Sequence, residues 1–355
     1  MLLSLGIFFL SECHSLCQSR AFGQEREDQT LWTERKITRT LTPYPQLPAR
    51  SFSTRNPRCD LCAVSASSNP STSTSFSHEG WTWQGRLFAT ERPVRVVVAF
   101  HGFGRPMEEM GNYLPLYPEG AAMLSVGISH HNDSIVPAFT DAPPVLEPTL
   151  LLEALEAWLD ELGLSDLPKH LLGHSLGGRI SLALFEHAPA AWSGMVLLAS
   201  DGFKKNAMYR FAVETALGRA CWAFVDRHAE AVRNFIRGLR RARIIPTHLE
   251  HFALHHTEDH AMRQLVLNTW KTHRLFWPSR HGTAKAWGQL PQRDVHVHAV
   301  FGDRDAIIPW AWSRPWRGLG GSHVHFLTVN SGHVMRHPET VEAVHRVILG
   351  ASNET

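Results

Sequence analysis

The sequence predicts an α/β fold with a mostly parallel central sheet flanked by helices, and three features of residues 80–355 support this. Short apolar runs rich in β-branched residues alternate with stretches of helical period, a pattern typical of parallel sheets. The runs are continuously apolar, as in strands buried on both faces. A chain of 355 residues that is 43% hydrophobic can fill a large core, which excludes global disorder.

The predicted elements follow in chain order. Strands are expected at residues 81–90, 94–100, 122–128, 170–173, 194–199, 295–301 and 324–329. Helices are expected at residues 148–162, 176–187 and 338–349. The first of these helices has Pro148 near its start, Gly163 after its end and leucines at helical spacing between them.

Residues 203–290 interrupt the alternation, because they contain several helical stretches and no convincing strand. An insertion of this size between two strands is expected to form a helical cap above the sheet. The core would then comprise residues 80–202 and 291–355.

Residues 1–79 are rich in Ser, Thr, Arg and Pro and show little periodicity, so we expect a leader or low-complexity extension outside the fold. The first ten residues have the length of a signal-peptide apolar region but lack a preceding positive charge. A cytoplasmic location is favoured, with export as the alternative. Cys59 and Cys62 have metal or redox spacing, but one such pair supplies only two ligands.

The motif that determines the chemistry lies between a short apolar strand and a helix. It reads Gly173-His174-Ser175-Leu176-Gly177-Gly178. A Gly-x-Ser-x-Gly segment in this context is typical of a nucleophile elbow, a turn so tight that the residues around the serine must be small. The backbone N–H of Leu176 would then point toward the oxygen of a reacting carbonyl.

With three further motifs, the sequence resembles the α/β-hydrolase superfamily over residues 80–355. The motifs are His101-Gly102-Phe103-Gly104, the segment from Gly302 through Asp305 to Pro309, and Ser331-Gly332-His333. The resemblance implies that Phe103 supplies a second oxyanion-hole N–H, that Asp305 is the acid and that His333 is the general base. The chain order Ser175, Asp305, His333 is the order expected of this fold.

Other assignments remain open. Asp303 and Asp201 are alternative acids, and Asp201 is otherwise a turn or helix cap before Gly202. His337 is an alternative base, although it precedes Pro338 at the start of the last helix. An inactive protein with the same fold is the remaining alternative.

The chain has 23 histidines, and none of them is expected to bind a metal. Five lie in one stretch of the insertion, where surface exposure is the better interpretation: His248, His251, His255, His256 and His260. Two pairs alternate along neighbouring strands and are expected to be packed or partly solvated side chains, not ligands: His296 with His298, and His323 with His325.

The formal net charge of the chain is +2, but the charged residues are unevenly distributed along the sequence. Residues 203–290 contain 15 basic and 6 acidic side chains, a net charge of +9. This block contains a run of five arginines, of which the first four recur at helical spacing on one face: Arg233, Arg237, Arg240, Arg241 and Arg243. A solvated helix face is the default interpretation. The alternatives are weak contact with an anionic substrate or lipid surface, and docking on the acidic body, residues 80–202 and 291–355, which carries a net charge of −8. No nucleic-acid-binding motif is present.

The predicted function is therefore that of a serine hydrolase that cleaves a small, apolar carboxylic ester through an acyl-enzyme on Ser175. No cofactor is expected. Carbon–carbon bond hydrolysis and acyl transfer to an alcohol are alternatives on the same three residues, and a non-catalytic ligand-binding protein is an alternative of another class. A membrane-spanning segment is not expected, because no apolar stretch of the sequence reaches the roughly 18–20 residues that span a bilayer.

Overall fold

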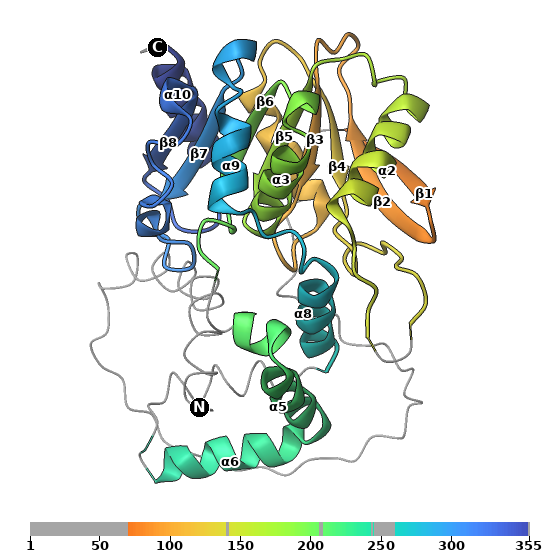
Figure 1. The fold of residues 1–355 in the computed structure, drawn as a ribbon, viewed down its shortest axis with the longest axis vertical. Helices are drawn as coiled ribbons and strands as arrows, with labels where there is room; N and C mark the ends of the chain where they lie inside the picture. Colours follow the sequence, from red (N-terminus) through yellow and green to blue (C-terminus); the bar gives the residue numbers. More distant parts are fainter. Residues whose placement is uncertain (1–69, 140–141, 206–208, 243, 245–259, 354–355) are drawn as a thin grey trace, which may run out of the picture.

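The computed structural model describes residues 70–353, apart from 140–141, 206–208, 243 and 245–259. Its centre is an eight-stranded sheet in the order β1-β2-β4-β3-β5-β6-β7-β8 (Figure 1). The first two neighbouring pairs, β1 with β2 and β2 with β4, are antiparallel, and all the others are parallel. The predicted α/β fold with a mostly parallel sheet is confirmed.

Seven of the eight strands have boundaries close to those predicted, and β1 was not predicted. The strands are β1 Thr72–His78, β2 Trp81–Phe88, β3 Val96–Phe100, β4 Ala122–Val126, β5 Lys169–His174, β6 Gly194–Leu198, β7 Val297–Gly302 and β8 Val324–Val329. In the central strand β3, every residue is buried. Val96, Val98 and Phe100 pack on one face, and Val97 and Ala99 on the other, which explains the continuous apolar run.

Helices cover both faces of the sheet. Buried residues of α2 (Pro148–Glu161), α3 (Leu176–His187) and α9 (Arg280–Trp287) belong to the larger core cluster. The 3₁₀-helical segment Met107–Leu116 and the helix α10 (Pro338–Asn353) cover the opposite face. These helices on both faces fix the positions of the central strands. The loops that leave the strand ends are therefore well placed to carry a site.

Strand β1 corrects the prediction that residues 1–79 lie outside the fold. Thr72–His78 pairs along its whole length with β2, from Thr72 opposite Leu87 to His78 opposite Trp81. The Ser/Thr-rich segment looks like low complexity because β1 is an edge strand with one face exposed and needs few apolar residues. The structure does not describe residues 1–69, which include the apolar N-terminal run, Cys59 and Cys62.

The insertion, residues 203–290, contains no strand in its described part. Apart from α9, its helical elements are a short π-helical turn Arg210–Glu214 and the helices α5 (Ala216–Arg227), α6 (Ala229–Arg241) and α8 (His260–Thr272). These helices lie beyond one end of the sheet, not on its faces (Figure 1). They have a small core of their own, formed by Ala212, Trp222, Val266 and Leu267.

Helix α9 falls within the range predicted for the cap but packs beside α3 on the sheet (Figure 1). Ala286 and Trp287 are buried in the main core. The predicted boundary at residue 290 therefore lies too late in the chain, because sequence alone does not show which body an amphipathic helix packs against.

The basic helix α6 lies farthest from the sheet, beyond α5 (Figure 1). Its arginines Arg237 and Arg241 are exposed. This position gives no support to docking of the arginine-rich helix on the acidic body. Among the residues that the structure describes, no helix combines the length and apolar character needed to cross a membrane.

Candidate active site

Ser175 lies at the sharp turn between β5 and α3. Its backbone dihedrals, φ 52° and ψ −116°, fall in a region that residues with a side chain rarely adopt. The turn is held by hydrogen bonds from the Ser175 N–H to the Leu198 carbonyl and from the Gly178 and Asp201 N–H groups to the Ser175 carbonyl. Such local strain is typical of a residue presented for reaction at a functional site.

The glycines around Ser175 are required by close backbone packing. A Cβ atom at Gly177 would overlap the backbone carbonyl of Phe100, and a Cβ atom at Gly173 would overlap the backbone of Gly177 and Gly178. These contacts are with main-chain atoms, which cannot move aside as a flexible side chain can. The prediction that both positions must be small is confirmed.

Ser175, His333 and Asp305 form one continuous chain of hydrogen bonds. The Oγ atom of Ser175 lies 2.9 Å from Nε2 of His333, and Nδ1 of His333 lies 2.8 Å from Oδ2 of Asp305. Both His333 and Asp305 are buried, while Ser175 is half-buried. The three side chains predicted from separate motifs are therefore in contact, with His333 between Ser175 and Asp305.

The carboxylate of Asp305 is fixed on both oxygens. Oδ1 accepts hydrogen bonds from the backbone N–H groups of Ile307 and Ile308, at 2.8 and 2.9 Å, and Oδ2 faces His333. An imidazole held in this way carries its proton on Nδ1 and leaves Nε2 free to accept the proton of Ser175.

Two further side chains position the loop that carries His333. Nε2 of His174 donates to the His333 backbone carbonyl at 2.9 Å, and burial lowers the pKa of His174 to about 4. Oδ1 of Asp303 accepts from the Ser331 N–H at 3.1 Å. Asp303 therefore contacts the loop that carries His333, whereas Asp305 is hydrogen-bonded to the His333 imidazole itself.

His101 fixes the conformation of the loop after β3 through two hydrogen bonds. Its Nδ1 donates to the Gly102 carbonyl at 2.8 Å, and its Nε2 accepts from the Ile128 N–H at 3.0 Å. Burial and the neighbouring His131 lower its pKa to about 3, so the ring is neutral. Because the Gly102 carbonyl and the Phe103 N–H belong to one peptide group, His101 fixes the direction of the Phe103 N–H.

The alternative acid and base have other partners. Asp201 accepts from the Gly202 N–H at 2.8 Å, the turn-capping role considered for it, and pairs with Arg179 at 3.1 Å. The backbone carbonyl of His337 accepts from the N–H groups of Thr340 and Val341 at the start of α10, and among the described residues it is His333, not His337, whose imidazole is hydrogen-bonded to Ser175. Of the candidate residues, only Asp305 is hydrogen-bonded to His333 Nδ1 in the described part of the chain.

Arg179 is a buried charge near the site that the sequence motifs did not single out. It lies one helical turn after Ser175, with 1% of its side chain exposed. Its guanidinium lies 4.4 Å from the ring centre of Trp277 and 5.4 Å from that of Tyr209, both in the insertion. An arginine within the otherwise apolar first turns of a predicted helix is a sequence signal that could have indicated a buried charge near Ser175. Its partner Asp201 was not predictable from spacing.

The helical insertion contacts the loops at the site. Phe103 packs against both the main core and the small core of the insertion. The end of α8 is bound through Thr272, whose carbonyl accepts from the Leu146 N–H and whose hydroxyl lies 2.8 Å from His130 Nε2. Of the five clustered histidines, only His260 lies within the described residues, where it pairs with Asp226.

This fold and the serine at its nucleophile elbow define a class of protein, the α/β hydrolases. The model of the alpha/beta hydrolase family matches residues 71–346, so the chain belongs to this family. A relative from Pseudomonas putida, the dihydrolipoyllysine-residue acetyltransferase component of an acetoin cleaving system, is 27% identical over 260 residues. The match covers 71% of this chain and 62% of that relative, so it spans less than two thirds of the relative's length.

Solved structures with a similar fold include enzymes of several activities. The haloalkane dehalogenase DbeA from Bradyrhizobium elkani has a TM-score of 0.52 and 15% identity, over 81% of this chain and 100% of that one. The carboxylesterase CesB from Bacillus subtilis has a TM-score of 0.50 and 16% identity, over 82% and 94%. A thioesterase domain from the curacin biosynthetic pathway has the same TM-score and identity, over 79% and 100%. At this identity the likeness extends to the fold alone.

Proposed function

We propose that this protein is a serine hydrolase that cleaves a carboxylic ester through an acyl-enzyme on Ser175. The observation that carries the proposal is the hydrogen-bond chain from Ser175 through His333 to Asp305, with both links below 3 Å. A serine hydroxyl becomes a useful nucleophile when a neighbouring imidazole removes its proton. Ser175 also disfavours the mechanism of relatives that use an aspartate nucleophile.

In the proposed reaction, Ser175 Oγ attacks the ester carbonyl while its proton moves to Nε2 of His333. Asp305 stabilises the imidazolium that forms. The backbone N–H groups of Phe103 and Leu176 would hold the oxyanion. Leu176 is the first residue of α3, so its N–H is not used by the helix and the helix dipole favours negative charge there. His333 then protonates the departing alcohol, and a water molecule releases the acyl group by the reverse sequence.

The helical insertion is proposed to act as a cap that gives the substrate site its apolar character. Support comes from Phe103, which packs against the small core of the insertion. Carbon–carbon bond hydrolysis and acyl transfer to an alcohol would use the same three residues. The Pseudomonas putida relative is named for acetyl transfer, but the match covers only part of it.

A fluorophosphonate probe tests the proposed nucleophile, because it reacts covalently with an activated serine. The wild-type protein is expected to label with one equivalent, and Ser175→Ala is expected to lose the label. Ser322→Ala, which changes an exposed serine of the loop before β8, serves as the matched control and should label fully. Equal labelling of Ser175→Ala and wild type, with intact mass locating the adduct elsewhere, would rule out Ser175 as the nucleophile.

Weak contact of helix α6 with an anionic lipid surface is the remaining part of the proposal. Exposed apolar side chains accompany the arginines of this region: Leu217, Phe224 and Phe235 are 59%, 59% and 52% exposed. At low salt the protein should sediment with vesicles of phosphatidylserine and phosphatidylcholine more than with phosphatidylcholine alone. The double variant Phe235→Ser/Arg237→Gln should reduce this excess. Equal sedimentation with both vesicles would leave α6 as a solvated face.

A further inference from the structure

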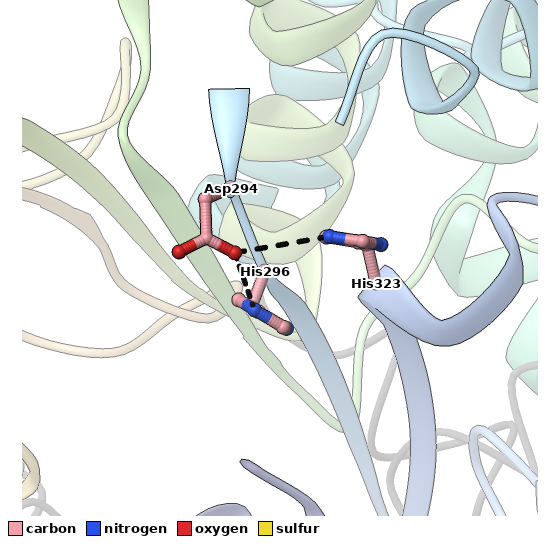
Figure 2. A group of neighbouring side chains, drawn as sticks. All are labelled: Asp294, His296 and His323. Atoms are coloured by element: carbon pink, nitrogen blue, oxygen red, sulfur yellow. Dashed lines mark ion pairs between the residues drawn. The ribbon is translucent and has the colours of Figure 1, made fainter. Parts of the chain in front are cut away.

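A cluster of three potential metal ligands lies where β7 and β8 begin. Figure 2 shows Asp294, His296 and His323 with their polar atoms turned toward one another. Asp294 and His296 come just before β7, and His323 is the residue directly before β8. Three residues from two chain segments, 27 positions apart at their closest, therefore meet at one edge of the sheet.

The distances are close to those that a metal site requires. Nε2 of His296 lies 3.5 Å from Oδ1 of Asp294, and Nε2 of His323 lies 3.9 Å from the same oxygen. All three ligand atoms lie within 4.8 Å of one another. In a tetrahedral zinc site with bonds of about 2.0–2.1 Å, ligand atoms are about 3.3 Å apart. Small rotations of these side chains would close the difference, and the Asp294 side chain, 91% exposed, is free to make them.

A second pair of histidines, His325 and His298, lies next to the cluster and can orient His296. Nδ1 of His296 lies 3.3 Å from Nε2 of His325. When His296 donates through Nδ1, its Nε2 keeps the lone pair that a metal needs, and the ring is held in place. His325 in turn stacks on His298 at a ring-centre distance of 4.9 Å. In known metal sites a hydrogen bond from the second ring nitrogen orients the metal-binding histidine, and His325 offers an acceptor for such a bond here.

We propose that Asp294, His296 and His323 form a binding site for a divalent transition metal ion, with Zn²⁺ as the natural probe. Two imidazoles and a carboxylate suit zinc and its neighbours better than Mg²⁺ or Ca²⁺, which prefer all-oxygen sites. The proposal replaces the expectation that His296 and His323 are packed or partly solvated side chains and not ligands.

The proposed ion would have a structural effect, because of its place in the fold. Strands β7 and β8 are parallel and pair from Val297 opposite Val324 onward, so the cluster lies at their first residues. Asp305 and His333 follow the other ends of the same strands. An ion bound to both strand starts would fasten the edge strand β8 to β7 without touching the proposed reacting groups.

Isothermal titration of the metal-free full-length protein with ZnSO₄ tests the proposal. Wild type is expected to bind one more equivalent than the double variant His296→Gln/His323→Gln, with micromolar Kd. Asp294→Asn should weaken that equivalent at least tenfold. His325→Phe keeps the ring stack but removes the hydrogen bond, and it should weaken binding by about 10- to 100-fold. MgCl₂ should give no comparable heat.

Thermal unfolding supplies a second readout that is independent of hydrolase activity. Zn²⁺ at about 100 times Kd should raise the Tm of wild type by about 3–8 °C and leave that of the double variant unchanged. His281→Gln, at an exposed position on α9, is the matched control and should behave as wild type. Metal-free variants must have the Tm of metal-free wild type for the comparison to hold. Equal stoichiometry and affinity in wild type and the double variant would overturn the proposal.

Discussion

Replacing His333 with alanine is expected to lower kcat/KM for a short p-nitrophenyl ester by about 10⁴-fold or more. His333 is the only described side chain hydrogen-bonded to Ser175 Oγ, so its loss leaves the hydroxyl without a proton acceptor. The loss should appear mainly in kcat, since a base acts in the transition state more than in substrate binding. Steady-state kinetics with the purified variant measure both constants.

The controls for this prediction separate the base from its surroundings. His337→Ala removes the alternative base at the start of α10 and should keep nearly full activity. Asp305→Asn should lower kcat strongly, because an amide can stabilise the wrong imidazole tautomer. Circular dichroism should show that each variant is folded. Substantial ester hydrolysis by a folded His333→Ala variant would contradict the assignment of the base.

Replacing Arg179 with methionine is expected to lower the free energy of unfolding by about 2–4 kcal/mol at pH 7. Met retains much of the packing volume but leaves the Asp201 carboxylate without its ion pair, at a position where the side chain is only 21% exposed. The contacts of the guanidinium with Trp277 and Tyr209 are lost as well. Urea unfolding at several pH values measures the change.

The pH dependence of this loss distinguishes a buried charge from simple loss of packing. Burial raises the pKa of Asp201 in the folded protein, while Arg179 lowers it, so removing Arg179 should raise it further. A raised pKa means that stability falls as pH rises from the unfolded value of about 3.9. The deficit of Arg179→Met should therefore be largest at neutral pH and shrink toward pH 4.

A double variant completes the test of the Arg179–Asp201 pair. Arg179→Met/Asp201→Asn should recover a large part of the stability lost in Arg179→Met, because it no longer buries an unpaired charge. A deficit that is the same at pH 4 and pH 7, with no recovery in the double variant, would show that packing alone accounts for the effect.

The strands and helices with strong local signals were predictable from the sequence. The boundaries of α3 and β8 match the predicted ranges, because helical periodicity and a bounded apolar run identify such elements without tertiary context. The positions of Ser175, Asp305 and His333 were predictable for a related reason. Each belongs to a short motif directly after a predicted strand. Their hydrogen bonds are found in the structure, and their catalytic roles remain predictions.

Features that depend on contacts between distant segments were not predictable. The edge strand β1 is defined by pairing with β2, since Ser and Thr alone give little apolar signal. Helix α9 belongs to the core because Trp287 packs there. The cluster around Asp294 exists because the register of β7 and β8 places two histidines together, and that register is not encoded by spacing within either strand.

The position of β8 at one edge of the sheet has a consequence for how such an enzyme would lose activity. Ser175 follows β5 in the middle of the sheet, whereas His333 follows a strand that is hydrogen-bonded on one side only. Edge elements open locally at a lower free-energy cost than central ones. Brief detachment of β8 would move His333, the proposed base, away from Ser175, the proposed nucleophile, while the other seven strands stay paired. Inactivation would then be a partial, reversible event that precedes denaturation of the domain.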